Sequence, residues 1–426
     1  MTRLRDDCFA VDGPLQSIEA AVARMLAQVP VVAGLEAVPL AEADGRIAGE
    51  DAHARNALPP FANAAVDGYA VRAAELGGAD GAVLAVSSRI AAGAAAAGAL
   101  APGTAARIFT GAPIPAGADT VVMQENVTPE DATRQTGRGA SSVRLPPGVV
   151  HGANVRRAGE DVSQGDCVVP AGRRLRPGDL ALAAAAGLDR VQVRRRLRVA
   201  LFSTGDELVE PGAPLRPGAI HDANRVMLAA LLGRLGARVS DLGILRDDPA
   251  ALARRLAAAA ADHDLVLTSG GVSVGEEDHV KGAVEASGRL VQWRLAIKPG
   301  KPVAMGVIAG TPFVGLPGNP VAAYVTLLFV VRPLLDRLGG AVSAMPLPQP
   351  VRAGFAHRRA PGRREFLRVG LVRAADGGLE ARRDPRQGSG MLATLAASDG
   401  LAEIHEETGD VAVGDFVGFY PHALLW

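Results

Sequence analysis

Two short stretches, RVALFST (residues 198–204) and DLVLTS (264–269), decide the fold of the longest regular region of this chain. Each is an apolar run of strand length, and the residues between them show the patterns of a helix, a strand and a second helix. Strands that alternate with helices of this length are typical of a doubly wound, mostly parallel sheet. Because the alternation continues beyond the second stretch, we expect one α/β domain over residues 194–340.

The rest of the chain is arranged around this α/β domain. Short β-like runs broken by Gly and Pro precede it and indicate a β-rich insert. Helical patterns at 14–28 and 177–187 lie on either side of that insert, so we expect these two helices to pack together in one split domain. The Pro-rich MPLPQP (345–350) is typical of a linker, and short strands and turns follow it. We predict a multidomain α/β protein with a split mixed α/β domain (14–56 and 155–193), a β-rich insert (57–154), the α/β domain (194–340) and a C-terminal β-barrel-like domain (341–426).

The composition argues against several classes of partner. The 45 Lys and Arg residues balance the 45 Asp and Glu residues, so no overall charge attracts nucleic acid or an anionic membrane. Aromatic residues make up only 4% of the chain, which disfavours a base-stacking platform. Cys8 and Cys167 lie far apart without a CxxC pattern, and the N-terminus lacks the apolar core of a signal peptide. No apolar stretch has the length of a membrane span, so we expect a cytoplasmic protein that binds neither nucleic acid nor membrane.

Three polar loops follow three strands of the predicted sheet. They are STGDEL (203–208), LRDDP (245–249) and TSGGVSVGEED (268–278). In open α/β sheets, ligands bind outside the carboxyl ends of the strands, where these loops begin. We therefore expect their side chains to converge at one edge of the sheet.

The third loop combines glycines with hydroxyl groups. Gly270, Gly271 and Gly275 would allow the backbone to approach a ligand closely, and Ser269 and Ser273 add hydroxyls. The helix that follows offers its N-terminal amides to an anion such as a phosphate. A turn that only tightens the packing of strand and helix explains the glycines equally well, and the loop matches neither a dinucleotide fingerprint nor a Walker A motif.

Acidic residues occupy the same edge of the sheet. A phosphate would be repelled by them unless Mg²⁺, which takes oxygen ligands and retains waters, lay between the two. The convergence of the loops favours this role for Asp206, Glu207 and Asp278, although a position in the first turn of a helix would also explain Asp278. Asp247 lies at the same edge and is a further candidate for the metal. Asp248 directly precedes a helix with Pro249 at its first position, so we interpret it as an N-cap.

Basic residues provide further candidates for holding an anion. Lys298 and Lys301 flank a Pro-Gly turn in IKPGKP. Arg364 and Arg368 share one face of the strand pattern GRREFLRV, where an oxyanion clamp and a solvated face are equally consistent with the spacing. Asn319 and Pro320 in LPGNPVA match a helix N-cap and N1 position, a structural role. The eight histidines form no HExxH motif and the chain has no GxSxG, which disfavours zinc catalysis and hydrolytic triads.

With these motifs assembled, the sequence closely resembles the molybdopterin molybdenumtransferase family, the MoeA type that is related to the gephyrin E domain. The resemblance covers nearly the whole chain in collinear order. It is carried by LPPFANAAVDGYA, TGAPIPAGADTVVMQE, RRAGEDVSQGD, FSTGDELVEPG, IHDAN, TSGGVSVGEED, IKPGKPVAMG, GLPGNPVA, GRREFLRV and GSGMLATLAASDGLAEI.

The resemblance implies an activity that composition alone does not. Such enzymes take adenylated molybdopterin and molybdate, insert molybdenum at the dithiolene and release AMP with the help of Mg²⁺. It also implies a homodimer formed through the split domain, with a cleft shared between subunits and with contacts to the separate molybdopterin adenylyltransferase and to recipient molybdoenzymes. The implied catalytic residues are Asp67, Thr110, Glu207, Asp278, Lys298 and Lys301. Asp161, Ser269, Gly270, Gly271, Ser273, Gly275, Arg364, Arg368 and Ser389 are the implied substrate-binding residues.

Departures from the family pattern and competing functions define what must be tested. Ala64 and Val66 stand where the family usually has Ser and Met, IHDAN replaces a Tyr-Asp-Ser-Asn form, and Asp399 replaces Asn. These changes leave the substrate contacts open. The α/β domain also resembles the adenylyltransferase of the preceding step, and a scaffold of the gephyrin kind or a tungsten-handling relative are further alternatives.

Overall fold

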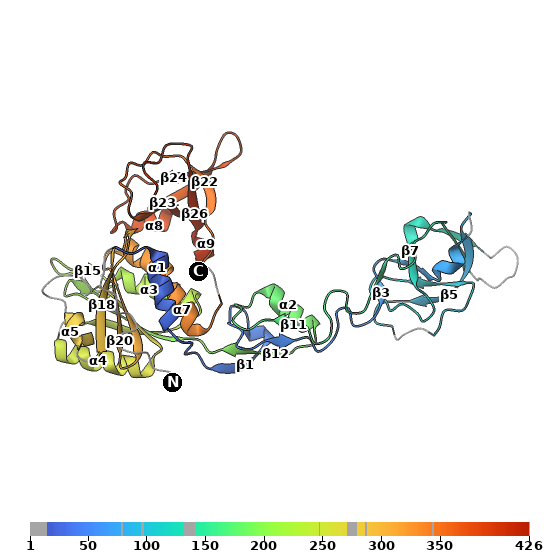
Figure 1. The fold of residues 1–426 in the computed structure, drawn as a ribbon, viewed down its shortest axis with the longest axis horizontal. Helices are drawn as coiled ribbons and strands as arrows, with labels where there is room; N and C mark the ends of the chain where they lie inside the picture. The colour runs from blue at the N-terminus through green and yellow to red at the C-terminus, as the bar shows by residue number, and fades with distance from the viewer. Residues whose placement is uncertain are drawn as a thin grey trace.

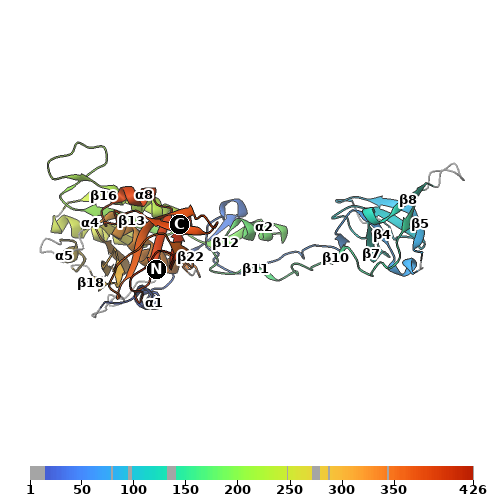
Figure 2. The same cartoon turned by 90° about the horizontal axis from the view of Figure 1, so that it is seen from above.

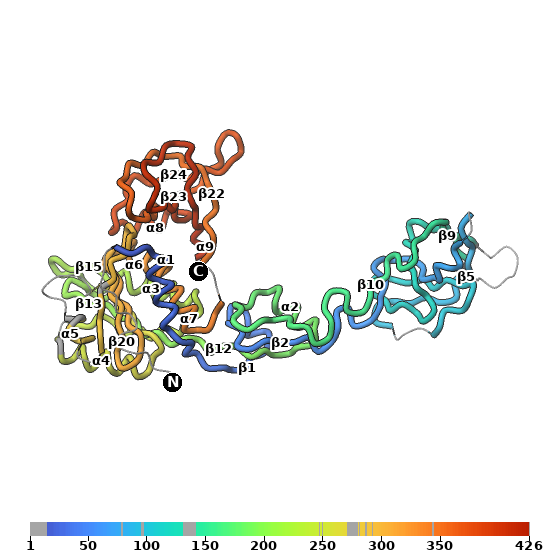
Figure 3. Tube along the Cα trace, viewed as in Figure 1, coloured from blue at the N-terminus to red at the C-terminus, as the bar shows by residue number. Residues whose placement is uncertain are grey.

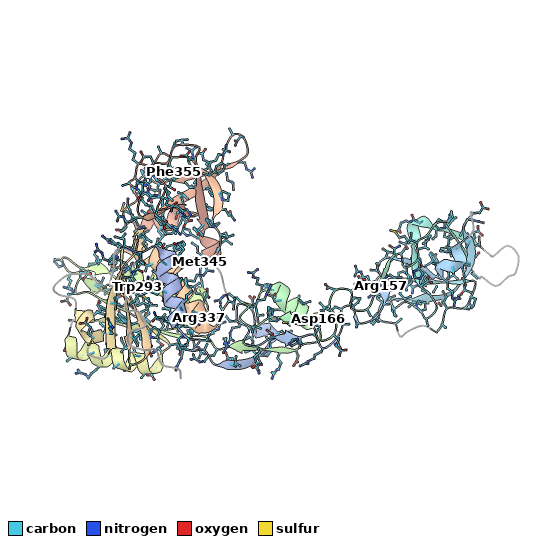
Figure 4. The ribbon with its side chains drawn as sticks, viewed as in Figure 1. Arg157, Asp166, Trp293, Arg337, Met345 and Phe355 are labelled. Atoms are coloured by element: carbon cyan, nitrogen blue, oxygen red, sulfur yellow. The ribbon has the colours of Figure 1, made fainter. Side chains whose placement is uncertain are left out.

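The computed structural model of the chain describes residues 15–77, 80–94, 98–131, 141–246, 248–270, 279–285, 288–342 and 345–425. The molecule is elongated, with an α/β region and a barrel at one end and a β-rich region at the other (Figure 1). A narrow middle region joins the two ends, and the view from above shows the same separation (Figure 2). Figure 4 places Phe355 in the barrel and Trp293 in the α/β region, with Arg157 and Asp166 along the connection to the far end.

The α/β region is built on a six-stranded sheet with the order β16-β13-β17-β21-β20-β18. The first four strands are parallel, and β20 and β18 are antiparallel to their neighbours, so the predicted mostly parallel sheet is confirmed. The strands are β13 (Arg198–Thr204), β16 (Arg238–Leu245), β17 (Leu265–Ser269), β18 (Gly288–Arg294), β20 (Pro302–Ile308) and β21 (Thr311–Leu316), and a short pair is formed by β14 (Leu208–Val209) and β15 (Ile220–His221).

Helices cover both faces of this sheet. On one face, α4 and α5 pack against the side chains of Phe202 and Phe313. On the other face lie α1, α3 and the continuous helical run α6-η5-α7, whose η5 part is π-helical. Asp248 accepts hydrogen bonds from the first amides of α4 and Pro249 begins that helix, so the predicted cap is confirmed. The helices are α1 (Ile18–Gln28), α3 (Ala223–Arg234), α4 (Pro249–Asp262), α5 (His279–Glu285), α6 (Pro320–Thr326), η5 (Leu327–Val331) and α7 (Arg332–Gly339).

The C-terminal region is a closed five-stranded barrel in the order β23-β24-β22-β26-β25, with β25 pairing back to β23. This confirms the predicted barrel-like fold. Alternation along β23 points Leu367 and Val369 into the barrel, whereas Phe366 faces outward and stacks on Phe329 of η5 at 4.2 Å between ring centroids. The elements are β19 (Ile297–Lys298), β22 (Gln349–Ala353), β23 (Arg364–Arg373), β24 (Leu379–Arg383), β25 (Gly400–Ile404), β26 (Phe416–Pro421), α8 (Leu392–Ala397) and α9 (His422–Leu425).

The middle region consists of segments from before and after the β-rich insert, which run side by side along the tube (Figure 3). The expectation that the two flanking helices pack together is wrong. Ile18, Ala21 and Met25 of α1 complete the core beside α7, while α2 packs on β11. The apolar face of α1 finds its partner in the α/β region, which a periodic pattern alone does not specify. The elements are β1 (Leu35–Pro39), η1 (Leu40–Glu42), β2 (Ala52–His53), β11 (Cys167–Val169), α2 (Pro177–Ala185) and β12 (Arg190–Arg194).

The far end is a β-rich domain around the sheet β7-β4-β6-β5-β9-β8. Its two apolar clusters contain Ile108 and Val121, and Val71 and Leu145, and share no residue with the core of the α/β region. Within the described parts of the chain, no helix is both long and apolar enough to cross a membrane. The elements are β3 (Asn63–Ala64), β4 (Gly68–Val71), η2 (Ala73–Leu76), β5 (Ala82–Ile90), β6 (Thr104–Ile108), β7 (Thr120–Met123), η3 (Gln124–Asn126), β8 (Thr128–Asp131), β9 (Ser141–Leu145) and β10 (Val155–Arg156).

Candidate active site

A cavity of about 370 Å³, which we call the sheet-edge cavity, lies at the carboxyl ends of β13 and β17. Thr204 and Ser269, the last residues of these parallel strands, line it together with Gly270. Because parallel strands end at the same sheet edge, the first and third polar loops start next to each other, as the sequence predicts. The other lining residues are Glu207, Leu208, Ile220, His221, Asp222, Ala223, Asn224, Gly318, Asn319, Pro320, Gly390 and Leu392.

A second cavity of about 460 Å³, the junction cavity, lies between the α/β region and the barrel. It forms where β19 pairs with the first residues of β23, bringing Lys298 next to Glu365. Asn319 lines both cavities, and the segment 387–390 runs from one to the other, so the two cavities adjoin. The remaining lining residues of the junction cavity are Pro299, Gly300, Pro302, Pro317, Ala322, His357, Phe366, Leu367, Gln387, Gly388 and Ser389.

Asn224 holds the sheet-edge cavity together. Its side-chain amide donates to Ser269 Oγ at 2.9 Å and to the Gly318 carbonyl at 2.7 Å, and the residue is buried. Asp222, two residues before Asn224, caps α3 and is ion-paired with Arg225 at 2.8 Å. A single amide therefore ties the start of α3 to the ends of β17 and β21.

A chain of polar contacts sets the charge of the junction cavity. Glu365 accepts a hydrogen bond from Lys298 Nζ at 3.2 Å and from His357 Nε2 at 2.9 Å. Burial raises the pKa of Glu365, but the hydrogen bond from His357 and the charge of Lys298 outweigh it, so the pKa lies below its usual value. Arg383 donates to Nδ1 of the same imidazole at 2.8 Å, which leaves Nε2 as the protonated nitrogen. Lys298 is thus held at the cavity wall by an ionised carboxylate.

Asn319 was expected to act only as a helix cap. It does occupy the N-cap position of α6, with Pro320 next to it, but its side chain makes no capping hydrogen bond. The side chain instead lines both cavities, and its Oδ1 is 4.0 Å from the position a Cβ would take on Gly390. Asn319 is therefore a residue of the candidate site, although the sequence pattern predicted only a structural role for it.

Comparisons with known proteins cover the chain almost end to end. Family models for the MoeA N-terminal region (domain I and II), for a probable molybdopterin binding domain and for the MoeA C-terminal region (domain IV) match residues 16–187, 200–337 and 350–422. A molybdopterin molybdenumtransferase from Haemophilus influenzae is 39% identical over 407 residues, covering 95% of this chain and 98% of that protein.

The chain belongs to the molybdopterin molybdenumtransferase family. Molybdopterin molybdenumtransferase 2 from Mycobacterium tuberculosis is 40% identical over 88% of this chain and 92% of its own. A crystal structure of a molybdopterin biosynthesis MoeA protein from Pyrococcus horikoshii matches with a TM-score of 0.80 at 29% identity, covering 96% of this chain and 100% of that one. The members of this family are transferases by name, and the resemblance stated from the motifs is confirmed.

Only some of the residues that the family resemblance implies line the described cavities. Glu207, Ser269 and Gly270 line the sheet-edge cavity, and Lys298 and Ser389 line the junction cavity. Lys301 lies between two lining residues of the junction cavity but does not line it. Asp247, Gly271, Ser273, Gly275 and Asp278 lie outside the described residues.

Gly270 illustrates why glycine occurs in the third loop. Its φ is +84°, and a Cβ would lie 2.8 Å from the carbonyl oxygen of Thr204 on the neighbouring strand. Any other residue would be strained there and would collide with β13. At this position the close-packing explanation of the glycine holds, and the same packing brings Ser269 to the cavity.

The described carboxylates at the sheet edge are few. Glu207 lines the cavity, Asp206 does not, and Asp222 is committed to Arg225. The described part of the chain contains no group of three or more His, Cys, Asp or Glu side chains arranged to hold a metal. Mg²⁺ is bound in many phosphate-transfer sites by one or two carboxylates together with substrate phosphates and waters. Glu207 fits that smaller role.

Arg364 and Arg368 line neither cavity. Arg364 is ion-paired with Glu403 at 3.2 Å and Glu406 at 2.9 Å, and also with Glu19 of α1. These contacts keep the pKa of Arg364 above its usual value although burial opposes this. Arg368 is 1% exposed and donates to main-chain carbonyls and to a threonine. Within one chain, the predicted oxyanion clamp is occupied by protein groups.

Asp67 and Thr110 lie in the β-rich domain at the far end of the molecule (Figure 1). Thr110 donates from its backbone N at 2.8 Å and from Oγ1 at 2.7 Å to the same oxygen of Asp67. The backbone hydrogen bond first, and then the hydroxyl, lower the pKa of Asp67. Asp161 lies in the connection to this domain, where its backbone N donates to the Leu58 carbonyl at 3.0 Å. None of these three residues reaches the cavities of its own chain.

Three of the departures from the family pattern, Ala64, Val66 and Asp399, lie away from the described cavities, whereas the IHDAN motif (220–224) lines the sheet-edge cavity. Ala64 is fully buried and Val66 packs in an apolar cluster of the β-rich domain. Asp399 accepts a hydrogen bond from the Leu371 amide at 2.8 Å, a role that an Asn side-chain oxygen would also fill. Within one chain, these three positions therefore line neither cavity.

The structure adds site residues that the sequence did not mark. Thr204, Asn224, Asn319, His357 and Glu365 line the two cavities. Asn224 stands in the IHDAN motif, directly after the start of a helix that follows a strand, and that placement was the available signal. The sequence contained no comparable signal for Glu365, because its partner Lys298 is 67 positions away and only the pairing of β19 with β23 brings the two together.

Proposed function

We propose that this protein inserts molybdenum from molybdate into adenylated molybdopterin and releases AMP. The observation that carries the proposal is the meeting of two cavities at Asn319 in a chain that belongs to this transferase family. The adenylated pterin is a long substrate with phosphates in its middle, and two adjoining cavities of about 370 and 460 Å³ suit such a shape. The junction cavity adds a fixed cation, which suits the oxyanion.

The residues of this chain supply binding, orientation and charge. We assign the phosphates to the sheet-edge cavity, where Ser269 and the start of α3 favour an anion. Lys298 and Lys301 would neutralise charge on the departing AMP and on molybdate. The Glu365 carboxylate orients Lys298, and Ser389, which lines the same junction cavity, has a hydroxyl that could contact the oxyanion. Molybdenum passes to sulfurs of the substrate, so the protein needs no thiolate of its own.

We assign Mg²⁺ to the acidic residues of the sheet edge. Glu207 would hold it from the described part of the site, and Asp206, Asp247 and Asp278 are the other candidates. When bound, the ion neutralises charge on the phosphate that is being cleaved. Gly270 with Gly271, Ser273 and Gly275 would form the loop that faces it.

We further propose a homodimer in which the far end of one chain completes the cavity of the other. Asp67, Thr110 and Asp161 cannot reach the cavities of their own chain, while the two Thr110 donors hold Asp67 ionised and oriented. Arg364 and Arg368 then support the barrel side of the site. The product would pass in the cytoplasm to recipient molybdoenzymes, with the separate molybdopterin adenylyltransferase as the supplier of the substrate.

The test is AMP release from purified adenylated molybdopterin in the presence of Mg²⁺, with and without molybdate. We expect release only when molybdate is present, and its loss in the Lys298→Gln variant. A parallel incubation with molybdopterin and ATP tests the adenylyltransferase alternative, and formation of the adenylate there would overturn the proposal. Replacing molybdate by tungstate separates the two oxyanions, and chelation of Mg²⁺ tests the metal requirement.

A further inference from the structure

One continuous stretch of the barrel region, residues 386–394, forms a wall of both cavities, and we call it the wall segment. Gln387, Gly388 and Ser389 line the junction cavity, whereas Gly390 and Leu392 line the sheet-edge cavity. The position of this segment therefore decides the shape of both.

The guanidinium of Arg368 forms hydrogen bonds with both ends of the wall segment. Its Nη2 donates to the carbonyls of Arg386 and Gly388 at 3.0 Å each, and its Nε donates to Thr394 Oγ1 at 3.0 Å. The Thr394 hydroxyl in turn donates a hydrogen bond to the Met391 carbonyl at 2.8 Å, so Arg368 is connected to the middle of the segment as well. A planar guanidinium can satisfy several acceptors at fixed angles, which a lysine ammonium on a flexible stem does not reproduce.

The backbone of the same strand residue is attached to the segment as well. The Gln387 side chain accepts from the Arg368 amide at 3.0 Å and donates to its carbonyl at 2.9 Å. Arg368 is 1% exposed and lines neither cavity, and among the described residues no carboxylate lies within ion-pair distance of it. Its polar contacts therefore go to the wall segment and not to a cavity.

The wall segment is attached on its other side to the α/β region. The Val321 amide of α6 donates to the Ser389 carbonyl at 3.0 Å, two residues from Asn319. A shift of the segment would therefore disturb both cavities at once. This separates an indirect role of Arg368 from direct contact with the oxyanion, which would affect only one substrate.

We propose that Arg368 is a positioning residue that holds the wall segment in place and so shapes the sites of both substrates, in place of the direct oxyanion contact expected from the sequence. The inference rests on the proposed function for its kinetic consequences, while its structural part concerns the protein alone.

Two substitutions test the proposal in the full-length protein. Thr394→Val removes the hydroxyl that Arg368 contacts, although Thr394 is buried and lines neither cavity. Arg368→Lys keeps the charge but not the planar fork. Thr394→Ser keeps the hydroxyl, and Arg373→Gln changes an exposed arginine on the same strand. Hydrogen–deuterium exchange of peptides over residues 384–396 is measured without substrates, and KM for molybdate, KM for the adenylated pterin and kcat are measured by AMP release.

We expect Thr394→Val and Arg368→Lys to speed exchange in the wall segment about 10-fold, since each loses a hydrogen bond that involves a charged group. Both should raise KM for both substrates, while Thr394→Ser and Arg373→Gln should match the wild type. Unchanged exchange in both variants, or a rise of the molybdate KM confined to Arg368→Lys, would overturn the proposal. If the wild type releases no AMP, the proposed function fails, but the exchange measurement still decides the role of Arg368.

Discussion

One apolar cluster runs from the α/β region into the barrel, beside separate clusters on the other face of the sheet and inside the barrel, whereas the clusters of the β-rich domain at the other end share no residue with it. Phe366 and Tyr420 of the barrel pack on Phe329 of η5, so the junction between barrel and sheet is part of that shared cluster. The β-rich domain is joined to the rest only through the narrow middle region (Figure 3).

This difference explains how the site residues are distributed. Groups that must keep fixed distances, such as Lys298 and Glu365, lie across a junction that is closed by apolar packing. Asp67 and Thr110 form their own rigid pair on a separate unit. A unit with a separate core can meet a site on another copy without disturbing its own fold.

The largest expected effect separates the two cores. Phe366→Ala, in the buried core shared by the sheet and the barrel, should lower the free energy of unfolding of the α/β region and barrel by about 3–5 kcal/mol. Ile108→Ala, equally buried in the β-rich domain, should lower the stability of that domain by about 2–5 kcal/mol. Calorimetry combined with hydrogen exchange should assign each change to one end. A common shift of all regions would contradict the separation.

The next effect concerns the proposed sharing of residues between chains. Asp67→Asn should lower the rate of AMP release about 100-fold, because Thr110 then orients a neutral amide in place of a carboxylate. Mixed dimers with a Lys298→Gln chain should recover about half of wild-type activity, since one of their two sites is then intact, and the unselected co-expressed mixture should recover about a quarter. Activity of differently tagged, purified mixed dimers is the measurement. An absence of recovery would place both residues in one chain's site.

A third prediction concerns the amide that ties the sheet-edge cavity together. Asn224→Ala removes two hydrogen bonds and should destabilise the α/β region by about 1–3 kcal/mol, with slower AMP release and an unchanged β-rich domain. Denaturant unfolding followed by regional hydrogen exchange measures it. Asn126→Ala, at an exposed position of the β-rich domain, is the matched control and should change neither quantity.

A smaller effect is a pH dependence of stability that we expect only at the end of the molecule that contains the α/β region and the barrel. His422 contacts Tyr324 Oη at 2.6 Å and Ser398 Oγ at 2.9 Å, and burial lowers its pKa below 6.5 although Asp399 opposes this. As the pH falls through 6.5 the unfolded chain takes up the proton first, so the free energy of unfolding decreases. The slope for one proton is at most about 1.4 kcal/mol per pH unit.

The measurement for this prediction compares wild type and His422→Gln by denaturant unfolding between pH 7.5 and 5.5. The wild-type α/β region and barrel should lose stability relative to the variant as the pH is lowered, and the β-rich domain should not. Parallel pH profiles of the two proteins would show that His422 does not carry the effect.

The smallest effect is expected where this chain departs from the family. Asp399→Asn should change stability by less than about 0.5 kcal/mol, because the side-chain oxygen can still accept from the Leu371 amide. AMP release should be unchanged, since Asp399 lines neither cavity. A loss of activity would show that this position reaches a site in the assembled protein.

Much of the architecture could be predicted from local patterns. The apolar runs of β13 and β17 and the cap at Asp248 identified the strands and helices of the α/β region. The placement of the polar loops at one sheet edge followed from the parallel order of the strands. The partner of α1 did not follow, because an amphipathic pattern shows that a helix has an apolar face but not which surface covers it.

By itself, the sequence determined the alternating α/β pattern, the barrel-like end and the collinear motifs of a molybdopterin molybdenumtransferase. Only the tertiary structure decided which side chains meet. Lys298 forms an ion pair with Glu365, and Arg368 donates hydrogen bonds to the wall segment. Asn319 occupies the N-cap position of α6, but it makes no capping hydrogen bond and lines both cavities. Helix and strand periods report on neighbours along one element, whereas these contacts join elements that chain topology and core packing bring together.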